Sequence, residues 1–152
     1  MNFQLDKAIG MHVNRTAFLM TEEIAKRFSA HGYQLSAQDF GILFRLSQQP
    51  TMTQVDIAAL MMRDKTTITR RIDSLVKKQL VERNPDPNDR RYYRISLTPS
   101  GKQALKLLAP MVSGFQQALL RDIPDAEKEI TINTLKHITE RLIQYKTTGN
   151  SS

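Results

Sequence analysis

Cysteine is absent from this chain of 152 residues. Disulfide bonds, thiol catalysis and cysteine redox sensing are therefore all excluded. The first residues, MNFQLDKAIG, carry neither a basic start nor an apolar run, so no signal peptide is predicted. No stretch approaches the roughly eighteen apolar residues of a membrane-spanning helix, and the expected location is the cytoplasm.

Acidic residues are also few: 15 Asp and Glu stand against 22 Lys and Arg, which gives a net charge of +7 and a pI near 9.9. A strongly basic protein usually binds something anionic, such as nucleic acid, an acidic membrane surface or an acidic protein. The excess is local, because residues 63–94 hold ten basic and five acidic residues, whereas the other 120 hold twelve and ten. This pattern favours a nucleic-acid footprint over a basic surface that is merely solvated.

Helical periodicity dominates the first sixty residues. Apolar residues at steps of three or four predict a long first helix that Gly32 ends. Two later Ser/Thr-x-x-Asp pairs, at 36–39 and 53–56, have the spacing of helix-starting capping boxes. The first pair predicts a helix that Pro50 ends, and the second predicts a short helix over 53–60.

The pattern changes after residue 79. LVER at 80–83 and YYRISL at 92–97 predict two short strands, and NPDPNDRR between them is rich in turn-forming residues. A β-hairpin is therefore expected. Thr98-Pro99 predicts the start of a further helix, Pro124-Asp125 predicts the start of the last one, and the tail, 148–152, is expected to fray.

The helix expected over 64–79 has only a narrow stripe of apolar residues, its apolar seam, and an unusual outer face. At about 100° per residue, Ile68, Ile72 and Leu75 fall within one arc. Arg70 points in nearly the opposite direction, and three of the four positions 66–69 are threonine. Threonine is a poor helix former, so a helix that is merely solvated has no need of this composition.

DNA reading supplies a reason for that composition. Short hydroxyl side chains fit close to base edges and phosphates, and arginine can bind guanine through two hydrogen bonds. In a helix-turn-helix, the second helix enters the major groove with its N-terminal residues foremost, and its dipole favours nearby phosphate. The short helix at 53–60 would support it, and the arginines of the hairpin turn would reach a minor groove.

Residues 53–105 resemble the winged helix-turn-helix core of the MarR family, bacterial regulators of antibiotic-resistance and stress genes. The most specific part is the wing signature of Asp-x-Arg, five further residues and Leu-Thr, which Asp89, Arg91, Leu97 and Thr98 match. The flanking helices match in order and length. The resemblance implies a mainly α fold with a small β-hairpin wing, a winged helix-turn-helix flanked by N- and C-terminal dimerisation helices.

The resemblance also implies a division of the chain and a set of partners. The expected parts are an N-terminal dimerisation helix (1–34), a DNA-binding lobe (35–100) with recognition helix (about 64–79) and wing (about 80–97), C-terminal dimerisation helices (101–147) and the frayed tail (148–152). It implies a homodimer on double-stranded DNA, with recognition helices in successive major grooves. It implies no required cofactor, and regulation that often uses a small aromatic or phenolic effector bound between the dimer and DNA-binding regions.

Carried over by position, the resemblance assigns three kinds of DNA contact. The major-groove residues are Thr66, Thr67, Thr69 and Arg70; the phosphate contacts are Lys65, Arg71 and Lys77; and the wing contacts are Arg90 and Arg91. Asp64 and Asp89 are expected to orient the wing, with an ion pair between Asp64 and Arg91. Gln79 stands where many relatives have glycine, and it would be strained if that position requires positive φ.

Other kinds of site find little support. The histidines are His12, His31 and His137, and without CxxC or HExxH spacing no metal site is predicted. No catalytic triad, glycine-rich phosphate loop or carboxylate pair stands out, so no enzyme activity is predicted. His12, Tyr33, Phe40 and Phe44 flank the junction of the first two helices and are effector-pocket candidates; core packing is the alternative.

The apolar faces of the terminal helices either cover one another within a monomer or form a dimer face. A palindrome-reading protein needs two-fold symmetry, which favours the dimer. The predicted function is that of a sequence-specific transcriptional regulator, a repressor released by a small aromatic or phenolic ligand, that reads a pseudo-palindromic operator as a homodimer. The alternative is a non-specific nucleic-acid-binding or architectural module, which would not discriminate between sequences.

Overall fold

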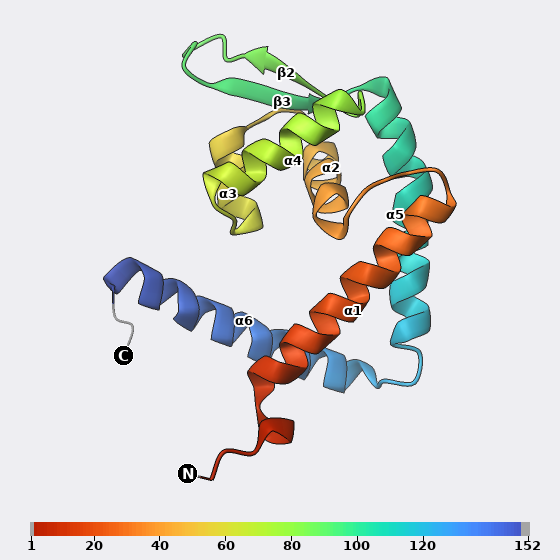
Figure 1. Ribbon diagram of the computed structural model, residues 1–152, viewed down its shortest axis with the longest axis vertical. Coiled ribbons are helices and arrows are strands. Elements are labelled where there is room, and N and C mark those ends of the chain that lie inside the picture. Colours follow the sequence, from red (N-terminus) through yellow and green to blue (C-terminus); the bar gives the residue numbers. More distant parts are fainter. Residues whose placement is uncertain (1, 150–152) are drawn as a thin grey trace. The chain divides into compact units, whose positions relative to one another are not determined.

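The computed structural model describes residues 2–149, and Figure 1 shows its elements in chain order. The helices are the 3-10 turn η1 (Leu5–Lys7), α1 (Ile9–Ala30), α2 (Ala37–Gln48), α3 (Gln54–Met61), α4 (Lys65–Lys77), α5 (Pro99–Leu119) and α6 (Asp125–Thr148). The strands are β1 (Met52–Thr53), β2 (Val81–Pro85) and β3 (Tyr93–Leu97). The mainly helical fold with a small hairpin agrees with the sequence prediction.

The chain forms two compact units that meet between Ser113 and Gly114, so α5 begins in the first unit and ends in the second. The first unit contains every strand and helices η1 to α4. The predicted functional division, with a boundary between 100 and 101, concerns dimerisation and DNA binding and stays a prediction.

Local capping explains where the helices begin. Ser36 Oγ accepts from the backbone N–H of Asp39 at 3.1 Å, and the Asp39 carboxylate accepts from the N–H of Ser36 at 2.9 Å. Thr53 and Asp56 form the same reciprocal box, at 3.1 and 3.4 Å, at the start of α3. Gly32, at φ 85°, follows the end of α1. Each of these boundaries was predicted from the sequence.

The sheet is antiparallel, with strand order β1-β3-β2. In its register Val81 faces Leu97 and Met52 faces Ile95. The predicted hairpin is confirmed, whereas β1 was missed because two residues are too few to show an alternating pattern. Since β1 leads directly into α3, it attaches the sheet to the base of the helix-turn-helix.

The core of the first unit lies where α1, α2, α3, α4, the sheet and the start of α5 meet. Its fully buried side chains are Phe28, Ile42, Leu43, Leu46, Met52, Ile57, Ile68, Ile72, Leu75, Val81, Ile95 and Leu108. The predicted apolar seam of α4 is therefore buried. Close packing needs a glycine at the start of α5, since a Cβ on Gly101 would lie 2.0 Å from the Leu80 carbonyl oxygen.

The second unit has a different character, because α6 buries none of its residues. Large apolar side chains along it are exposed, among them Ile130, Leu135, Leu142 and Tyr145. No helix within residues 2–149 is long and apolar enough to cross a bilayer. Of the tail predicted to fray, Thr148 still belongs to α6, and residues 150–152 lie outside the described part of the chain.

Candidate nucleic-acid interface

A tight turn joins α3 to α4. Met62 adopts a left-handed conformation, with φ 54°, and closes α3 by donating to the Ala59 carbonyl. The N–H of Arg63 donates to the Ala58 carbonyl at 3.1 Å. Asp64 then caps α4, so only three residues separate the two helices. This is the geometry of a helix-turn-helix, in which the second helix projects its first turns outward.

Asp64 stabilises the exposed start of α4. Its carboxylate accepts from the Thr67 backbone N–H at 3.0 Å and from the Thr67 hydroxyl at 2.6 Å. These bonds lower the pKa of Asp64, with the side-chain bond from Thr67 as the largest cause and the backbone bond next. The N-terminus of a helix favours a nearby negative charge, and the Asp64 carboxylate occupies this place in α4.

Two of the predicted major-groove residues, Thr66 and Arg70, are exposed and make no side-chain hydrogen bond or ion pair within residues 2–149. The other two differ. The Thr67 hydroxyl is used in the cap, and the Thr69 hydroxyl donates to the Lys65 carbonyl at 2.8 Å and accepts from Gln54 of α3 at 3.2 Å. Thr66 and Arg70 thus retain all of their bonding capacity for a ligand.

The predicted phosphate contacts also separate into two kinds. Lys65 and Lys77 are exposed at opposite ends of α4. Arg71 is only half-exposed and lies beside the buried Asp39 of α2, with Nη1 to Oδ1 at 3.8 Å. That oxygen of Asp39 has no hydrogen bond in the described residues, so the nearby guanidinium is its main compensation. Arg71 therefore connects α4 to α2.

Two further contacts hold the C-terminal half of α4. Arg83 of β2 pairs with Asp73 at 2.6 Å, which connects the helix to the wing. The Lys78 ammonium donates to the backbone carbonyl of Gln34, in the segment between α1 and α2. With the Arg71–Asp39 pair, these contacts position α4 against three other parts of the unit.

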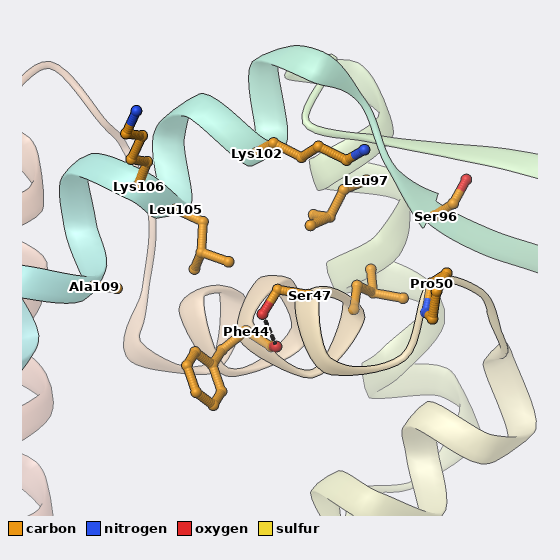
Figure 2. Close-up of a pocket in the computed structure, with 10 residues that line it drawn as sticks. Phe44, Ser47, Pro50, Ser96, Leu97, Lys102, Leu105, Lys106 and Ala109 are labelled. Atoms are coloured by element: carbon orange, nitrogen blue, oxygen red, sulfur yellow. Dashed lines mark hydrogen bonds between the residues drawn. The ribbon is translucent and has the colours of Figure 1, made fainter.

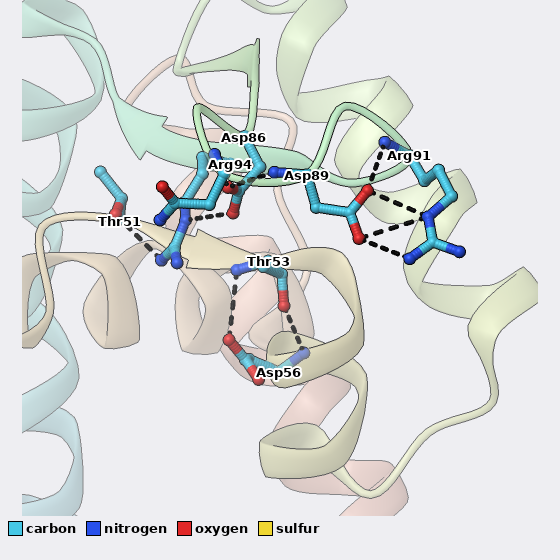
Figure 3. Close-up of polar contacts among 8 residues, drawn as sticks. Thr51, Thr53, Asp56, Asp86, Asp89, Arg91 and Arg94 are labelled. Atoms are coloured by element: carbon cyan, nitrogen blue, oxygen red, sulfur yellow. Dashed lines mark hydrogen bonds and ion pairs between the residues drawn. The ribbon is translucent and has the colours of Figure 1, made fainter.

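Within the wing, Arg91 is held by Asp89. Its Nε donates to Oδ1 at 3.0 Å and its Nη2 lies 2.8 Å from Oδ2 (Figure 3). Its guanidinium carbon is 5.9 Å from the Tyr92 ring centroid. The bond from the Arg91 side chain is the largest cause of the lowered pKa of Asp89. Arg90 is exposed and makes no such pair among the described residues.

The predicted ion pair between Asp64 and Arg91 is wrong. Asp64 is occupied by Thr67, and Arg91 by Asp89, and no ion pair joins the two within residues 2–149. A partner two residues away closes a much shorter loop than one on another element, so the local pair costs less chain entropy. Asp89 does restrain the wing arginine, whereas Asp64 acts only on its own helix.

Gln79 has a φ of 61°, the positive φ that the sequence analysis expected to strain this residue. Its carbonyl accepts from the Thr98 hydroxyl at 2.6 Å, and the same hydroxyl accepts from the Gly101 N–H at 3.0 Å. One threonine thereby closes the junction after α4 and caps α5. The junction has the geometry that a glycine would provide, at a conformational cost to Gln79.

A cavity of about 580 Å³ lies between α2 and the segment formed by the end of β3 and the first half of α5. Its lining is mainly apolar, with two serines and two lysines: Phe44, Leu46, Ser47, Pro50, Ser96, Leu97, Lys102, Leu105, Lys106 and Ala109. Figure 2 shows Leu97 and Leu105 pointing toward α2, Lys102 extending along the rim toward Ser96, and Lys106 pointing away. The size suits a small organic molecule.

The predicted effector-pocket residues stay a prediction, and most of them lie outside the lining of this cavity. Of the four candidates only Phe44 lines the cavity. Phe40 instead lies between Phe28 and Phe44, with ring centroids 5.8 and 6.1 Å apart, and the exposed His12 ring bonds to the Asp6 carbonyl. The sequence carried no signal of the α5 wall, because periodicity does not show which helix faces α2.

No group of three or more His, Cys, Asp or Glu residues in the described part of the chain is arranged to hold a metal ion. Among the described residues, the exposed interface side chains without an internal partner are hydroxyl, guanidinium and ammonium groups, those of Lys65, Thr66, Arg70, Lys77 and Arg90. Their chemistry is that of an anion-binding surface.

Comparisons with known proteins agree with this geometry. The family model described as "MarR family" matches residues 35–93. A protein of Thauera aromatica, named as a regulatory protein for the hcr operon, is 31% identical over 99 residues, which cover 65% of this chain and 60% of that protein. The chain thus matches about three-fifths of that relative's length.

Solved structures extend the likeness to nearly the whole chain. A MarR transcriptional regulator from Methanosarcina mazei Go1 is 26% identical, with a TM-score of 0.76 over 90% of this chain and 96% of that one. The S. aureus MepR–DNA complex has the same fold at 20% identity, with a TM-score of 0.79 over 91% of this chain and 99% of that one. Motif, fold and interface together place residues 35–93 in the MarR family, and nearly the whole chain shares the winged helix-turn-helix fold of MarR transcriptional regulators.

Proposed function

We propose that this chain is a cytoplasmic repressor that binds a pseudo-palindromic operator in double-stranded DNA as a homodimer, and that it has no enzyme activity. Thr66 and Arg70 read base edges in the major groove, Lys65 and Lys77 contact phosphates, and Arg90 enters a flanking minor groove. The positive charge of residues 63–94 supplies much of the affinity through phosphate contacts, which makes binding steeply salt-dependent.

The observation that carries this proposal is the outer face of α4. Asp64 and Thr67 complete the N-terminal cap between themselves, while Thr66 and Arg70 stay exposed and unpaired among the described residues. A surface that served stability alone would gain from pairing Arg70 with an acid on its own helix. MepR, which shares this fold, was solved in complex with DNA, which supports the same use of the surface here.

The roles that we propose for the other polar residues of α4 and the wing follow from the contacts that they make within the protein. Thr67 and Thr69 shape the recognition helix, since their hydroxyls are bonded within the protein. Arg71 and Arg91 position α4 and the wing, since each lies beside an acid. Direct DNA contact is therefore assigned to the side chains that have no internal partner.

Dimerisation is supported separately by each unit. At the N-terminal end of the first unit, Leu5, Ile9 and Val13 are exposed. In the second unit, α6 exposes apolar side chains along its length and buries none. Such helices are stable when a partner covers them, and a two-fold dimer would present two recognition helices about one DNA turn apart.

The deciding experiment is selection from random duplexes, followed by titration of the selected site and a scrambled duplex across a salt series. We expect a pseudo-palindromic site bound by one dimer, with a preference of about a thousandfold or more. Equal affinity for both duplexes, with the same salt slope, would instead establish the non-specific nucleic-acid-binding or architectural alternative.

The cavity favours a ligand-responsive regulator. We propose that it binds a small aromatic molecule carrying an acidic group, whose ring packs against Phe44 and Leu105 and whose anion meets Lys102 at the rim. Because the cavity lies between α2 and α5, a bound molecule would alter how the DNA-binding lobe sits on α5 and so change the separation of the two recognition helices.

Benzoate, salicylate and neutral phenol are suitable probes, measured by their effect on operator affinity. We expect the two carboxylates to weaken operator binding more than phenol does, and Lys102→Met to remove that difference. Lys106→Met is the matched control, because its side chain points away from the cavity (Figure 2). Equal responses in wild type and Lys102→Met would place the anion elsewhere.

A further inference from the structure

Arg94 occupies the middle of the sheet, on β3, where its register partners are Asn84 of β2 and Thr53 of β1. The adjacent Ile95 is fully buried, and the Arg94 side chain is 36% exposed. Neither the wing signature nor the charge pattern singles this arginine out. Its partners show that it connects two parts of the lobe.

One end of this connection is the wing loop. Asp86, which is 6% exposed, accepts from the backbone N–H groups of Asn88 and Asp89 through Oδ1, at 2.8 and 3.2 Å. Its Oδ2 accepts from Arg94 Nε at 2.9 Å. A single carboxylate thus holds the backbone that leads to the wing tip and the arginine of the central strand.

The other end is the base of the helix-turn-helix. Arg94 Nη1 donates to the Thr51 hydroxyl at 3.4 Å, immediately before β1. Two residues further on, Thr53 caps α3 (Figure 3). The guanidinium fork therefore reaches from the wing loop to the segment that begins the supporting helix.

We propose that Arg94 is a positioning residue that sets the place of the wing tip relative to the helix-turn-helix, and so determines which flanking base pairs Arg90 can read. This inference rests on the proposed function. The planar fork of arginine can bond Asp86 and Thr51 at the same time, whereas a lysine ammonium is a point charge on a flexible chain. Minor-groove reading depends on groove width, so the place of the wing tip matters.

The test uses the full chain and the operator obtained by selection, with its outer flanks changed from A·T to G·C. The variants are Arg94→Lys, Arg94→Met, Asp86→Asn and Thr51→Val. For each one, affinity for both flanks is measured, backbone protection is mapped by hydroxyl-radical footprinting, and thermal unfolding reports the folded state. Arg15→Met, on the exposed outer surface of α1, controls for the loss of one positive charge.

We expect Arg94→Lys, Arg94→Met and Asp86→Asn to keep core protection, lose flanking protection and reduce the preference between flanks by about tenfold, the size of one base-pair preference. The double variant Arg94→Met/Asp86→Asn should be no worse than either single variant, since both act on one connection. Thr51→Val should act in the same direction with a smaller effect. Arg15→Met should keep the wild-type flank preference.

The proposal is overturned if a folded variant retains the wild-type preference between flanks. It is overturned as well if Arg94→Lys has that preference while Arg94→Met loses it, because the charge at position 94 would then contact DNA directly. It is also overturned if core and flanking protection fall in equal proportion. If Arg94→Met does not fold, Arg94→Lys and Thr51→Val decide. Failure of the proposed function is recognised earlier, because the wild-type chain would then select no preferred duplex.

Discussion

At the scale of single residues, the two ends of the recognition helix α4 differ in their effect on stability. Asp64 begins α4 with a carboxylate that accepts two hydrogen bonds from Thr67. Gln79, just after the helix, takes a φ of 61° that glycine adopts without a steric penalty. Asp64 therefore contributes stability that depends on pH, whereas Gln79 has a strained backbone that glycine at this position would relieve.

Gln79→Gly should stabilise the protein by about 0.5 to 1 kcal/mol, because a left-handed conformation costs a residue with a Cβ about 1 to 2 kcal/mol and glycine loses part of this gain to chain entropy. Urea unfolding with an unchanged slope is the measurement. Lys77→Gly, in helical conformation at the end of α4, is the matched control and should lose up to about 1 kcal/mol. Destabilisation by both would contradict the strain at Gln79.

The stability of the DNA-binding lobe should decrease in acid. The folded-state pKa of Asp64 lies below the reference value of 3.8, and those of Asp86 and Asp89 are lowered too. The unfolded chain therefore binds more protons, so this stabilisation is present above about pH 4 and is lost as pH falls through the folded pKa.

Unfolding midpoints measured from neutral pH down to about pH 3 test this expectation. Asp64→Asn should keep near-wild-type stability at neutral pH, since asparagine is also a good N-cap residue, and should show a shallower decline in acid. An equally steep decline in the variant would show that Asp64 contributes nothing to the acid dependence.

At the scale of elements, the lobe depends on how closely α5 approaches the junction between α4 and β2. The backbone of Gly101 leaves no space for a side chain against the Leu80 carbonyl. Thr98 bonds to Gln79 at the same place. The start of α5 thereby fixes the end of the recognition helix and the beginning of the wing.

Gly101→Ala should destabilise the protein by about 3 kcal/mol or prevent folding, because the Cβ would meet backbone at 2.0 Å and backbone cannot move aside cheaply. Gly114→Ala is the matched control on the same helix, with no heavy atom within 4 Å of its Cβ. It should gain up to about 1 kcal/mol. Thermal unfolding of both variants compares them, and similar effects would refute the close approach.

Arg70→Ala should reduce the preference of the protein for its operator over a scrambled duplex by about 1 to 3 kcal/mol, since it removes the side chain that we propose reads bases. Lys26→Ala, on the exposed surface of α1, should leave that preference unchanged. Titrations at one salt concentration are the measurement. A loss of affinity that is the same on both duplexes would reassign Arg70 to phosphate contact.

At the scale of the whole molecule, many large apolar side chains of the single chain are exposed to solvent. In α6, Leu135 is 39% exposed and Leu142 is 56% exposed. Solvent-exposed apolar side chains in such numbers mark an interaction surface. The proposed homodimer would cover them and would provide the symmetry that a palindromic operator requires.

The double variant Leu135→Glu/Leu142→Glu should be monomeric by sedimentation velocity and should bind the operator about a hundredfold more weakly or worse, because it loses the second half-site. Asn133→Glu places a charge at a polar position of the same helix and is the matched control. A tight dimer in the double variant would remove α6 from the dimer interface.

Much of the fold was predictable because its signals are local. Capping pairs three residues apart, the apolar seam of α4 and the turn-rich hairpin act over a few residues, and each was confirmed. The errors concern contacts assigned by resemblance or by proximity in sequence. The pair expected between Asp64 and Arg91 is replaced by shorter-range bonds. Of the residues expected around an effector only Phe44 lines the cavity, and their role stays a prediction.

The sequence by itself determined where α2, α3, α5 and α6 begin, the apolar seam of α4 and the basic window, since propensity, periodicity and charge are properties of neighbouring residues. Only the tertiary structure decided which cations remain available to a ligand. Arg71 lies beside Asp39, 32 positions away in the chain, and the cavity brings Phe44 together with Leu105. Periodicity shows that a face is apolar or charged but not which element it meets, and that pairing depends on packing of the whole unit.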